Sequence, residues 1–141
     1  ASLTSWTFDV QRDVLTRIGS RSDDKIYGVS VSDVMDGRGG ADLLAGFRGD
    51  DRLTGGNGRD TIFGGDGADR ISGGGGRDDL YGEAGNDSFV FVRLDRAFDT
   101  IHGFSDVGGN NDVVEFDSAV FGLLGRGEDG LGLLKNEHFL T

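Results

Sequence analysis

The chain has 141 residues, a formal net charge of −11 and no cysteine, and its length suggests one domain. An acidic chain is not expected to bind nucleic acid or an anionic membrane surface, and it attracts cations instead. Without cysteine there is neither a disulfide framework nor a thiolate metal site. No stretch approaches the roughly 18 apolar residues of a membrane span. The chain has 27 glycines and only 35% hydrophobic residues, so its composition is also compatible with a disordered low-complexity chain.

The first 18 residues show a loose alternation of apolar and polar side chains. Trp6, Phe8 and Val10 fall on one face of a strand, and Leu15 and Ile18 continue the apolar content. We expect one or two strands in residues 1–18, which cover the first turn of the segment that follows. An unstructured leader is the alternative.

Eight consecutive units of nine residues fill residues 19–90. In six of them, glycine stands at positions one and four, aspartate at position six and an apolar residue at position eight: GRGGADLLA (from Gly37), GFRGDDRLT, GGNGRDTIF, GGDGADRIS, GGGGRDDLY and GEAGNDSFV. The two earlier units, GSRSDDKIY and GVSVSDVMD, have Ser22 and Val31 at position four. We call these the six full units and the two early units.

The repeat predicts a coil built from strands. Positions one to six are rich in turn residues, and positions seven to nine are typical of a strand. One apolar residue per nine is too few for a sandwich, but it suits a coil in which two units make one turn and the position-eight side chains of opposite strands meet inside. Successive turns would stack at about 4.8 Å. We therefore expect an all-β fold, a right-handed parallel β-roll.

The nine-residue period stops at Phe91, and aromatic residues become frequent. Because a stack of repeats needs a terminal segment unlike the repeats, residues 91–141 are expected to form an aromatic cap. Val113, Val114 and Phe116 follow a Gly-Asn-Asn turn and predict a strand. For residues 126–141, a short amphipathic helix and a frayed end are both open.

Two units per turn place the position-six aspartates in two columns. One column holds Asp24, Asp42, Asp60 and Asp78, and the other holds Asp33, Asp51, Asp69 and Asp87. Two carboxylates about 5 Å apart repel by roughly 3 kcal/mol at an effective dielectric of about 20. Several such pairs would unfold a small domain, so a cation must lie between them. Lysine and arginine are poor candidates, because a glycine turn leaves little room for a long side chain.

A hard divalent cation with oxygen ligands fits this arrangement. The loops can aim backbone carbonyls at one point, and the candidate residues there include the position-four glycines Gly40, Gly49, Gly58, Gly67, Gly76 and Gly85. Carboxylates from two stacked turns complete a six-oxygen shell that suits Ca²⁺ better than Mg²⁺ or a soft metal. The expected sites are Asp42/Asp60, Asp60/Asp78, Asp51/Asp69 and Asp69/Asp87; the pairs Asp24/Asp42 and Asp33/Asp51 would raise the count from four ions to six.

Calcium binding is expected to drive folding. The position-eight side chains bury little apolar surface, whereas ordering a glycine-rich backbone costs much conformational entropy. We therefore expect metal-free repeats to be disordered and to fold where calcium is abundant.

The repeats resemble those of the RTX (repeats-in-toxin) family, whose nonapeptide forms a calcium-binding parallel β-helix. The segment FVFVRLDRAFDTIHGFSDVGGNNDVVEFDSAVF is similar to the segment that follows RTX repeats in secreted bacterial proteases, lipases and alginate epimerases. The resemblance implies that Asp99 helps to close the last calcium site. It also implies a secreted, extracellular protein, export by the type I secretion machinery, and a calcium-folded module that stabilises an upstream passenger domain.

Two other functions are weighed against this one. Phe63 and Tyr81 share position nine in one column, so an extracellular polysaccharide could stack on them, with Trp6 and Phe47 as further aromatic candidates. An enzyme would need acid–base groups, for which His102, His138 and the carboxylates Asp99, Asp106, Asp112, Glu115 and Asp117 are candidates. No nucleophile or oxyanion loop accompanies them, and GRGEDG lacks the βαβ context of a dinucleotide site, so no enzyme is expected.

Overall fold

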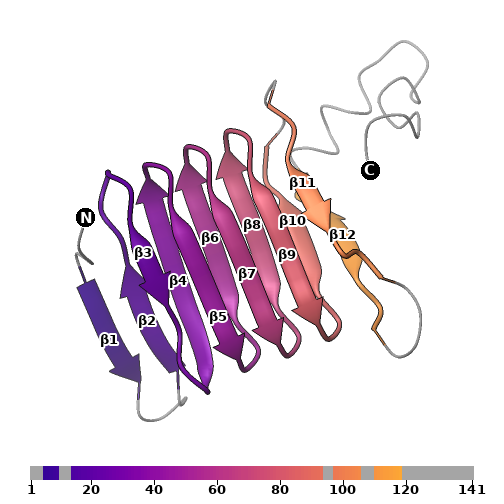
Figure 1. Cartoon of the computed structure of the whole chain (residues 1–141), viewed down its shortest axis with the longest axis horizontal. Helices are drawn as coiled ribbons and strands as arrows, with labels where there is room; N and C mark the ends of the chain where they lie inside the picture. Colours follow the sequence, from indigo (N-terminus) through magenta and orange to yellow (C-terminus); the bar gives the residue numbers. More distant parts are fainter. Residues whose placement is uncertain (1–4, 10–13, 94–96, 106–109, 119–141) are drawn as a thin grey trace.

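The structure is a computed structural model that describes residues 5–9, 14–93, 97–105 and 110–118. One sheet has seven strands, in the spatial order β1 (Ser5–Asp9), β2 (Val14–Ile18), β4 (Ser32–Gly39), β6 (Arg52–Asn57), β8 (Arg70–Gly75), β10 (Ser88–Phe91) and β12 (Val113–Phe116). The other has five, in the order β3 (Lys25–Tyr27), β5 (Leu43–Arg48), β7 (Thr61–Asp66), β9 (Asp79–Ala84) and β11 (Thr100–His102). Figure 1 shows that from β2 onwards successive strands alternate between the two sheets along the coil.

The strands of the repeats are parallel, and each one pairs with the strand of the next but one unit. Leu44 is in register with Ile62 in the five-stranded sheet, and Leu53 is in register with Ile71 in the seven-stranded sheet. Two units therefore make one turn of the coil. The all-β fold and the parallel β-roll that the period predicts are confirmed.

The core is a single file of position-eight side chains between the two sheets. Each of them is at most 1% exposed, and together they form one cluster: Ile26, Met35, Leu44, Leu53, Ile62, Ile71, Leu80 and Phe89. Phe91 and Ile101, beyond the last unit, pack against this cluster. Because each turn of the coil contributes only two such side chains, the hydrophobic core is thin.

Strands outside the repeats continue the sheets at both ends of the coil. At the N-terminal end, β1 pairs antiparallel with β2, and β2 pairs parallel with β4. At the C-terminal end, β11 adds to β9 and β12 adds to β10, both parallel. Much of the expected cap, including residues 119–141 with His138, lies outside the described residues, and so does Asp106.

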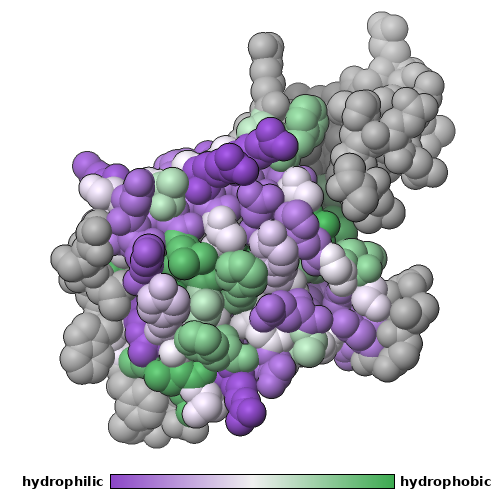
Figure 2. All heavy atoms as spheres, in the orientation of Figure 1, coloured by the Kyte–Doolittle hydropathy of each residue, from purple (hydrophilic) through white to green (hydrophobic). Residues whose placement is uncertain are grey.

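The outer surface is largely hydrophilic. Figure 2 shows one face of the molecule, on which hydrophobic side chains gather in the middle, surrounded by hydrophilic ones. Tyr27 and Phe47 are 47% and 54% exposed, and their rings lie 6.3 Å apart. No helix in the described part of the chain is long and apolar enough to cross a membrane.

The loops of the six full units require left-handed backbone at two positions. At position four, the glycines have φ between 114° and 140°, and a Cβ on Gly58 would collide with the carbonyl oxygen of Gly40 one turn away. Position two is also left-handed, and there three units carry the non-glycine residues Arg38, Phe47 and Glu83, with φ of 72°, 76° and 74°. Left-handed backbone costs about 1–2 kcal/mol for such residues. Nothing in the nine-residue pattern indicates this strain, because position two is not always glycine.

Replacing the strained Arg38 by glycine should stabilise the coil. The side chain is exposed, so little packing is lost, and the free energy of unfolding in calcium should rise by about 1 kcal/mol in urea denaturation. The matched control is Arg52→Gly in β6, an exposed arginine whose φ is not positive, where glycine should lower the free energy of unfolding. Equal effects of the two substitutions would show that position two is not strained.

Candidate metal centre

The position-six aspartates lie inside the coil in the two columns that the nine-residue spacing predicts. All of them are nearly inaccessible, with at most 3% exposure: Asp24, Asp33, Asp42, Asp51, Asp60, Asp69, Asp78 and Asp87. A buried carboxylate is costly unless its oxygens are hydrogen-bonded or its charge is compensated. The partners of the two carboxylate oxygens therefore decide what these columns can do.

In the six full units, the Oδ1 atom of the aspartate joins its turn of the coil to the turn before it. It accepts a hydrogen bond from the backbone N–H of the aspartate one turn earlier, at distances of 2.7–3.0 Å for the acceptors Asp42, Asp51, Asp60, Asp69, Asp78 and Asp87. The carboxylate thus supports the backbone ladder as well as carrying charge.

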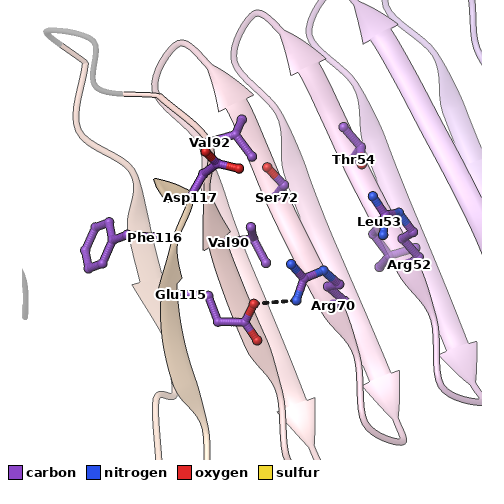
Figure 3. A pocket seen from close by; sticks show the side chains of 10 residues that line it. All are labelled: Arg52, Leu53, Thr54, Arg70, Ser72, Val90, Val92, Glu115, Phe116 and Asp117. Atoms are coloured by element: carbon purple, nitrogen blue, oxygen red, sulfur yellow. Dashed lines mark hydrogen bonds and ion pairs between the residues drawn. The ribbon is translucent and has the colours of Figure 1, made fainter. Parts of the chain in front are cut away.

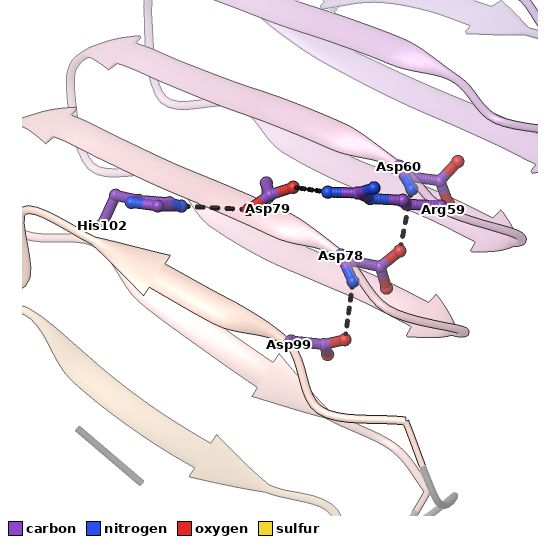
Figure 4. Close-up of polar contacts among 6 residues, drawn as sticks. All are labelled: Arg59, Asp60, Asp78, Asp79, Asp99 and His102. Carbon is purple, nitrogen blue, oxygen red and sulfur yellow. Dashed lines mark hydrogen bonds and ion pairs between the residues drawn. The ribbon is translucent and has the colours of Figure 1, made fainter. Parts of the chain in front are cut away.

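Both columns continue beyond the repeats. Asp99 Oδ1 accepts from the Asp78 N–H at 3.0 Å, as Figure 4 shows, so the structure places this residue at the end of its expected column. Asp112 Oδ1 accepts from the Asp87 N–H at 3.1 Å and ends the other column. The sequence analysis considered Asp112 only as one carboxylate among several. The signal was present, because Asp112-Val113-Val114 repeats the aspartate and apolar spacing of positions six to eight.

The Oδ2 atoms of the full units are different. Those of Asp42, Asp51, Asp60, Asp69 and Asp87 are buried and have no hydrogen-bond donor in the described structure. Each lies close to the position-one glycine of its own unit, so closely that a Cβ there would collide with it. A Cβ on Gly55, for example, would also lie 2.7 Å from the carbonyl oxygen of Gly73, one turn further on. Glycine at position one therefore keeps space around an unsatisfied carboxylate oxygen.

This space suits a hard cation. Its polar atoms are carboxylate and carbonyl oxygens, which Ca²⁺ prefers. No three His, Cys, Asp or Glu side chains converge on one point among the described residues, so a cation would need backbone oxygens in addition to the aspartates. The position-one glycines, absent from the sequence-based site, border this space; the position-four glycines keep their expected ligand role as a prediction.

The metal-free carboxylates are poorly suited to carrying charge. Burial, reinforced by neighbouring aspartates, raises the pKa of Asp60 and Asp69 to about 7. Burial likewise raises the pKa of Asp51 to about 6. Burial also raises the pKa values of Asp42 and Asp87, while the backbone hydrogen bonds to Oδ1 act in the opposite direction. A cation beside Oδ2 would favour the ionised form.

In the two early units, protein groups take the place next to Oδ2. Asp24 Oδ2 accepts from the Ser20 N–H at 2.5 Å and the Ser20 Oγ at 2.8 Å. Asp33 Oδ2 accepts from the Val29 N–H at 2.7 Å. The additional sites expected at Asp24/Asp42 and Asp33/Asp51 therefore differ from the others, because the oxygen that is open in the full units already has a donor here.

Among the described residues, most of the candidate catalytic groups lie in separate parts of the coil, but Glu115 and Asp117 line one hollow together. Asp99 and Asp112 end different columns, and Glu115 is 2.5 Å from Arg70 on the outside of the seven-stranded sheet. A shallow hollow of about 340 Å³ lies there, shown in Figure 3, between strands β6, β8, β10 and β12. His102 Nε2 lies 3.1 Å from Asp79 Oδ1, and Asp79 also binds Arg59 at 3.2 Å (Figure 4).

Comparison with known families agrees with this geometry. The family model described as RTX calcium-binding nonapeptide repeat (4 copies) matches residues 27–62 and 54–89. The resemblance to the RTX family is thereby confirmed, and these repeats make the chain a calcium-binding module. Searches of curated proteins and of solved structures give no match.

The raised pKa values predict how the metal-free coil responds to pH. The pKa values of Asp60 and Asp69 are near 3.8 in the unfolded chain but about 7 in the metal-free coil. The coil therefore binds more protons than the unfolded chain between these values, and its stability is greatest below about pH 4 and is lost as pH rises through about 7. Far-UV circular dichroism of chelator-treated protein should show more β-structure at pH 5 than at pH 8, and Asp60→Asn with Asp69→Asn should flatten this dependence. More β-structure at pH 8 would contradict it.

Proposed function

We propose that calcium binding is the folding signal of this module. The observation that carries the proposal is the row of buried Oδ2 atoms that have no donor within the described structure, set beside glycines that leave room for an ion. In a metal-free coil these carboxylates would be buried beside one another, and both the burial and the neighbouring negative charges make their ionised form costly. Calcium removes this cost, so its binding free energy becomes folding free energy.

The number of ions follows from the ends of the two columns. Four sites lie between stacked full units, at Asp42/Asp60, Asp60/Asp78, Asp51/Asp69 and Asp69/Asp87. Two more would lie at the C-terminal junctions, where the Oδ1 atoms of Asp99 and Asp112 accept from the backbone N–H of the preceding turn as a repeat aspartate does. Asp112 Oδ2 accepts from the Ser105 N–H, so the ion at that junction would bind the open Oδ2 of Asp87. The proposed upper count of six ions equals the count suggested by the sequence, but we propose the last two sites at the C-terminal end of the coil instead of the N-terminal end.

Calcium dependence suits a protein that folds only after export. The thin core and the net charge of −11 disfavour the folded state where calcium is scarce, as in the cytosol. Outside the cell, where calcium is abundant, the module would fold and stabilise or nucleate folding of an upstream passenger domain. Type I secretion and an extracellular location are part of this proposal, which the match to RTX repeats supports.

The polysaccharide alternative is less well supported by the geometry. The rings of Phe63 and Tyr81 stack on each other with centroids 4.6 Å apart, and His102 stacks on Tyr81 at 4.2 Å with an angle of 6°. Sugars stack on ring faces, and both faces of Tyr81 are covered by its neighbours. These aromatic residues therefore contribute to the cohesion of successive turns, which favours the calcium-folding function.

Titration of the metal-stripped protein tests the proposed function. Calcium should produce a cooperative transition from coil to β-structure in far-UV circular dichroism, and magnesium at the same concentration should not. Asp60→Asn or Asp69→Asn should raise the calcium midpoint by at least about tenfold, because each removes a buried charged ligand.

The matched control is Asp66→Asn, on the same coil, where the side chain is 69% exposed and should not contribute a carboxylate ligand. Its midpoint should equal that of the unchanged protein. Full β-structure without metal, or equal responses to calcium and magnesium, would contradict the proposal.

A further inference from the structure

The N-terminal end of the coil contains an arginine inside the turn that precedes the repeats. Strand β2 pairs with β4 so that Arg17 is in register with the core residue Met35, and Leu15 is in register with Asp33. Arg17 thus occupies the place of a position-eight core residue, and Leu15 occupies the place of a column aspartate. The second aspartate column therefore ends at Asp33, next to this arginine.

Arg17 and Asp33 form an ion pair in which the aspartate is buried and the arginine is partly buried. Arg17 Nη1 donates to Asp33 Oδ1 at 3.2 Å, and the side chains are 15% and 0% exposed. The other oxygen, Oδ2, accepts from the Val29 N–H. Both oxygens of Asp33 therefore have donors within the protein, whereas Oδ2 of its column neighbour Asp51 has none. Arginine side chains are rarely buried unless they are paired, and the charged partner of Arg17 is Asp33.

The backbone of this unit agrees with a loop that closes on its own carboxylate. In the full units, positions two and four have positive φ, but Val29 and Val31, at the same positions of this unit, are not among the described residues with positive φ. In this unit the Val29 N–H donates to Asp33 Oδ2, as the Ser20 N–H at the same position of the unit before donates to Asp24 Oδ2. Val31 at position four is thus compatible with a unit that holds its aspartate without metal.

We propose that Arg17 is a built-in cation that takes the place of calcium at the N-terminal end of the second column. The unit from Gly28 then needs no ion of its own. Because the Asp33 N–H donates to Asp51 Oδ1 at 2.7 Å, the fixed Asp33 also presents the first calcium-dependent turn with a positioned donor. This inference rests on the proposed function, and it specifies where metal dependence begins along the coil.

The test counts bound calcium ions by equilibrium dialysis and measures the calcium midpoint of folding by circular dichroism. Asp33→Asn, alone or with Arg17→Met, should bind as many ions as the unchanged protein, whereas Asp51→Asn should bind at least one fewer. Arg17→Met alone leaves a buried carboxylate without a charge partner, so its midpoint should rise by about tenfold, and the double variant should recover most of this loss. The control is Arg48→Met, whose exposed side chain pairs with Asp66 at 3.6 Å and whose midpoint should not change.

Two results would overturn the inference: loss of an ion in Asp33→Asn, which would make Asp33 a calcium ligand, or equal midpoints for Arg17→Met and Arg48→Met. An extra ion bound by Arg17→Met would support it, because the freed Asp33 would then accept calcium. If Arg17→Met does not fold, the number of ions bound by Asp33→Asn still decides whether Asp33 is a calcium ligand. Absence of calcium-dependent folding in the unchanged protein would instead contradict the proposed function, so the two failures are distinguishable.

Discussion

The structure depends on two columns of aspartates that are buried along the axis of the coil. Their Oδ1 atoms hold successive turns through backbone N–H groups, while the Oδ2 atoms of the full units face space that glycine leaves open. The same side chains therefore hold the coil together and make its metal-free form costly. A core of one side chain per unit does not offset this cost by itself. In the proposed function, calcium is therefore part of the folded structure, because it compensates charges that the fold brings together.

Sequence periodicity predicted most of the fold, because an unbroken nine-residue period leaves few ways to stack identical loops. It placed Leu44 beside Ile62 and Asp42 beside Asp60, as the structure shows. Features that break the period were not foreseen. Asp112 follows Asp87 by 25 residues, whereas repeat aspartates of one column are 18 residues apart. The backbone at Phe47 is left-handed although the residue is not glycine, so the sequence does not indicate this conformation. Arginine was judged too long for a glycine turn, yet Arg17 reaches its column from a strand outside the repeats.

The two ends of the coil differ in the way they terminate the columns. At the N-terminal end, Asp24 and Asp33 bind hydroxyl, N–H and guanidinium groups of the protein. At the C-terminal end, the Oδ1 atoms of Asp99 and Asp112 continue the repeat pattern of hydrogen bonds outside the repeats, while Asp112 Oδ2 accepts from the Ser105 N–H. At the N-terminal end, protein groups bind both oxygens of Asp33, whereas Asp24 Oδ1 is buried without a hydrogen-bond donor in the described structure. At the C-terminal end, the ladder of Oδ1 hydrogen bonds extends into the flanking strands. If calcium drives folding as proposed, this asymmetry would give the second column a direction, from the Arg17–Asp33 pair towards the full units.

The most direct measurement is anomalous diffraction from crystals of the calcium-loaded protein. The account predicts two rows of calcium peaks along the coil, each within coordination distance, about 2.3–2.6 Å, of Oδ2 atoms such as those of Asp60 and Asp69. No peak should lie beside Asp33. Calcium found only on exposed carboxylates, with the buried Oδ2 atoms bound to water or to one another, would contradict the central claim that the aspartate columns are the calcium sites.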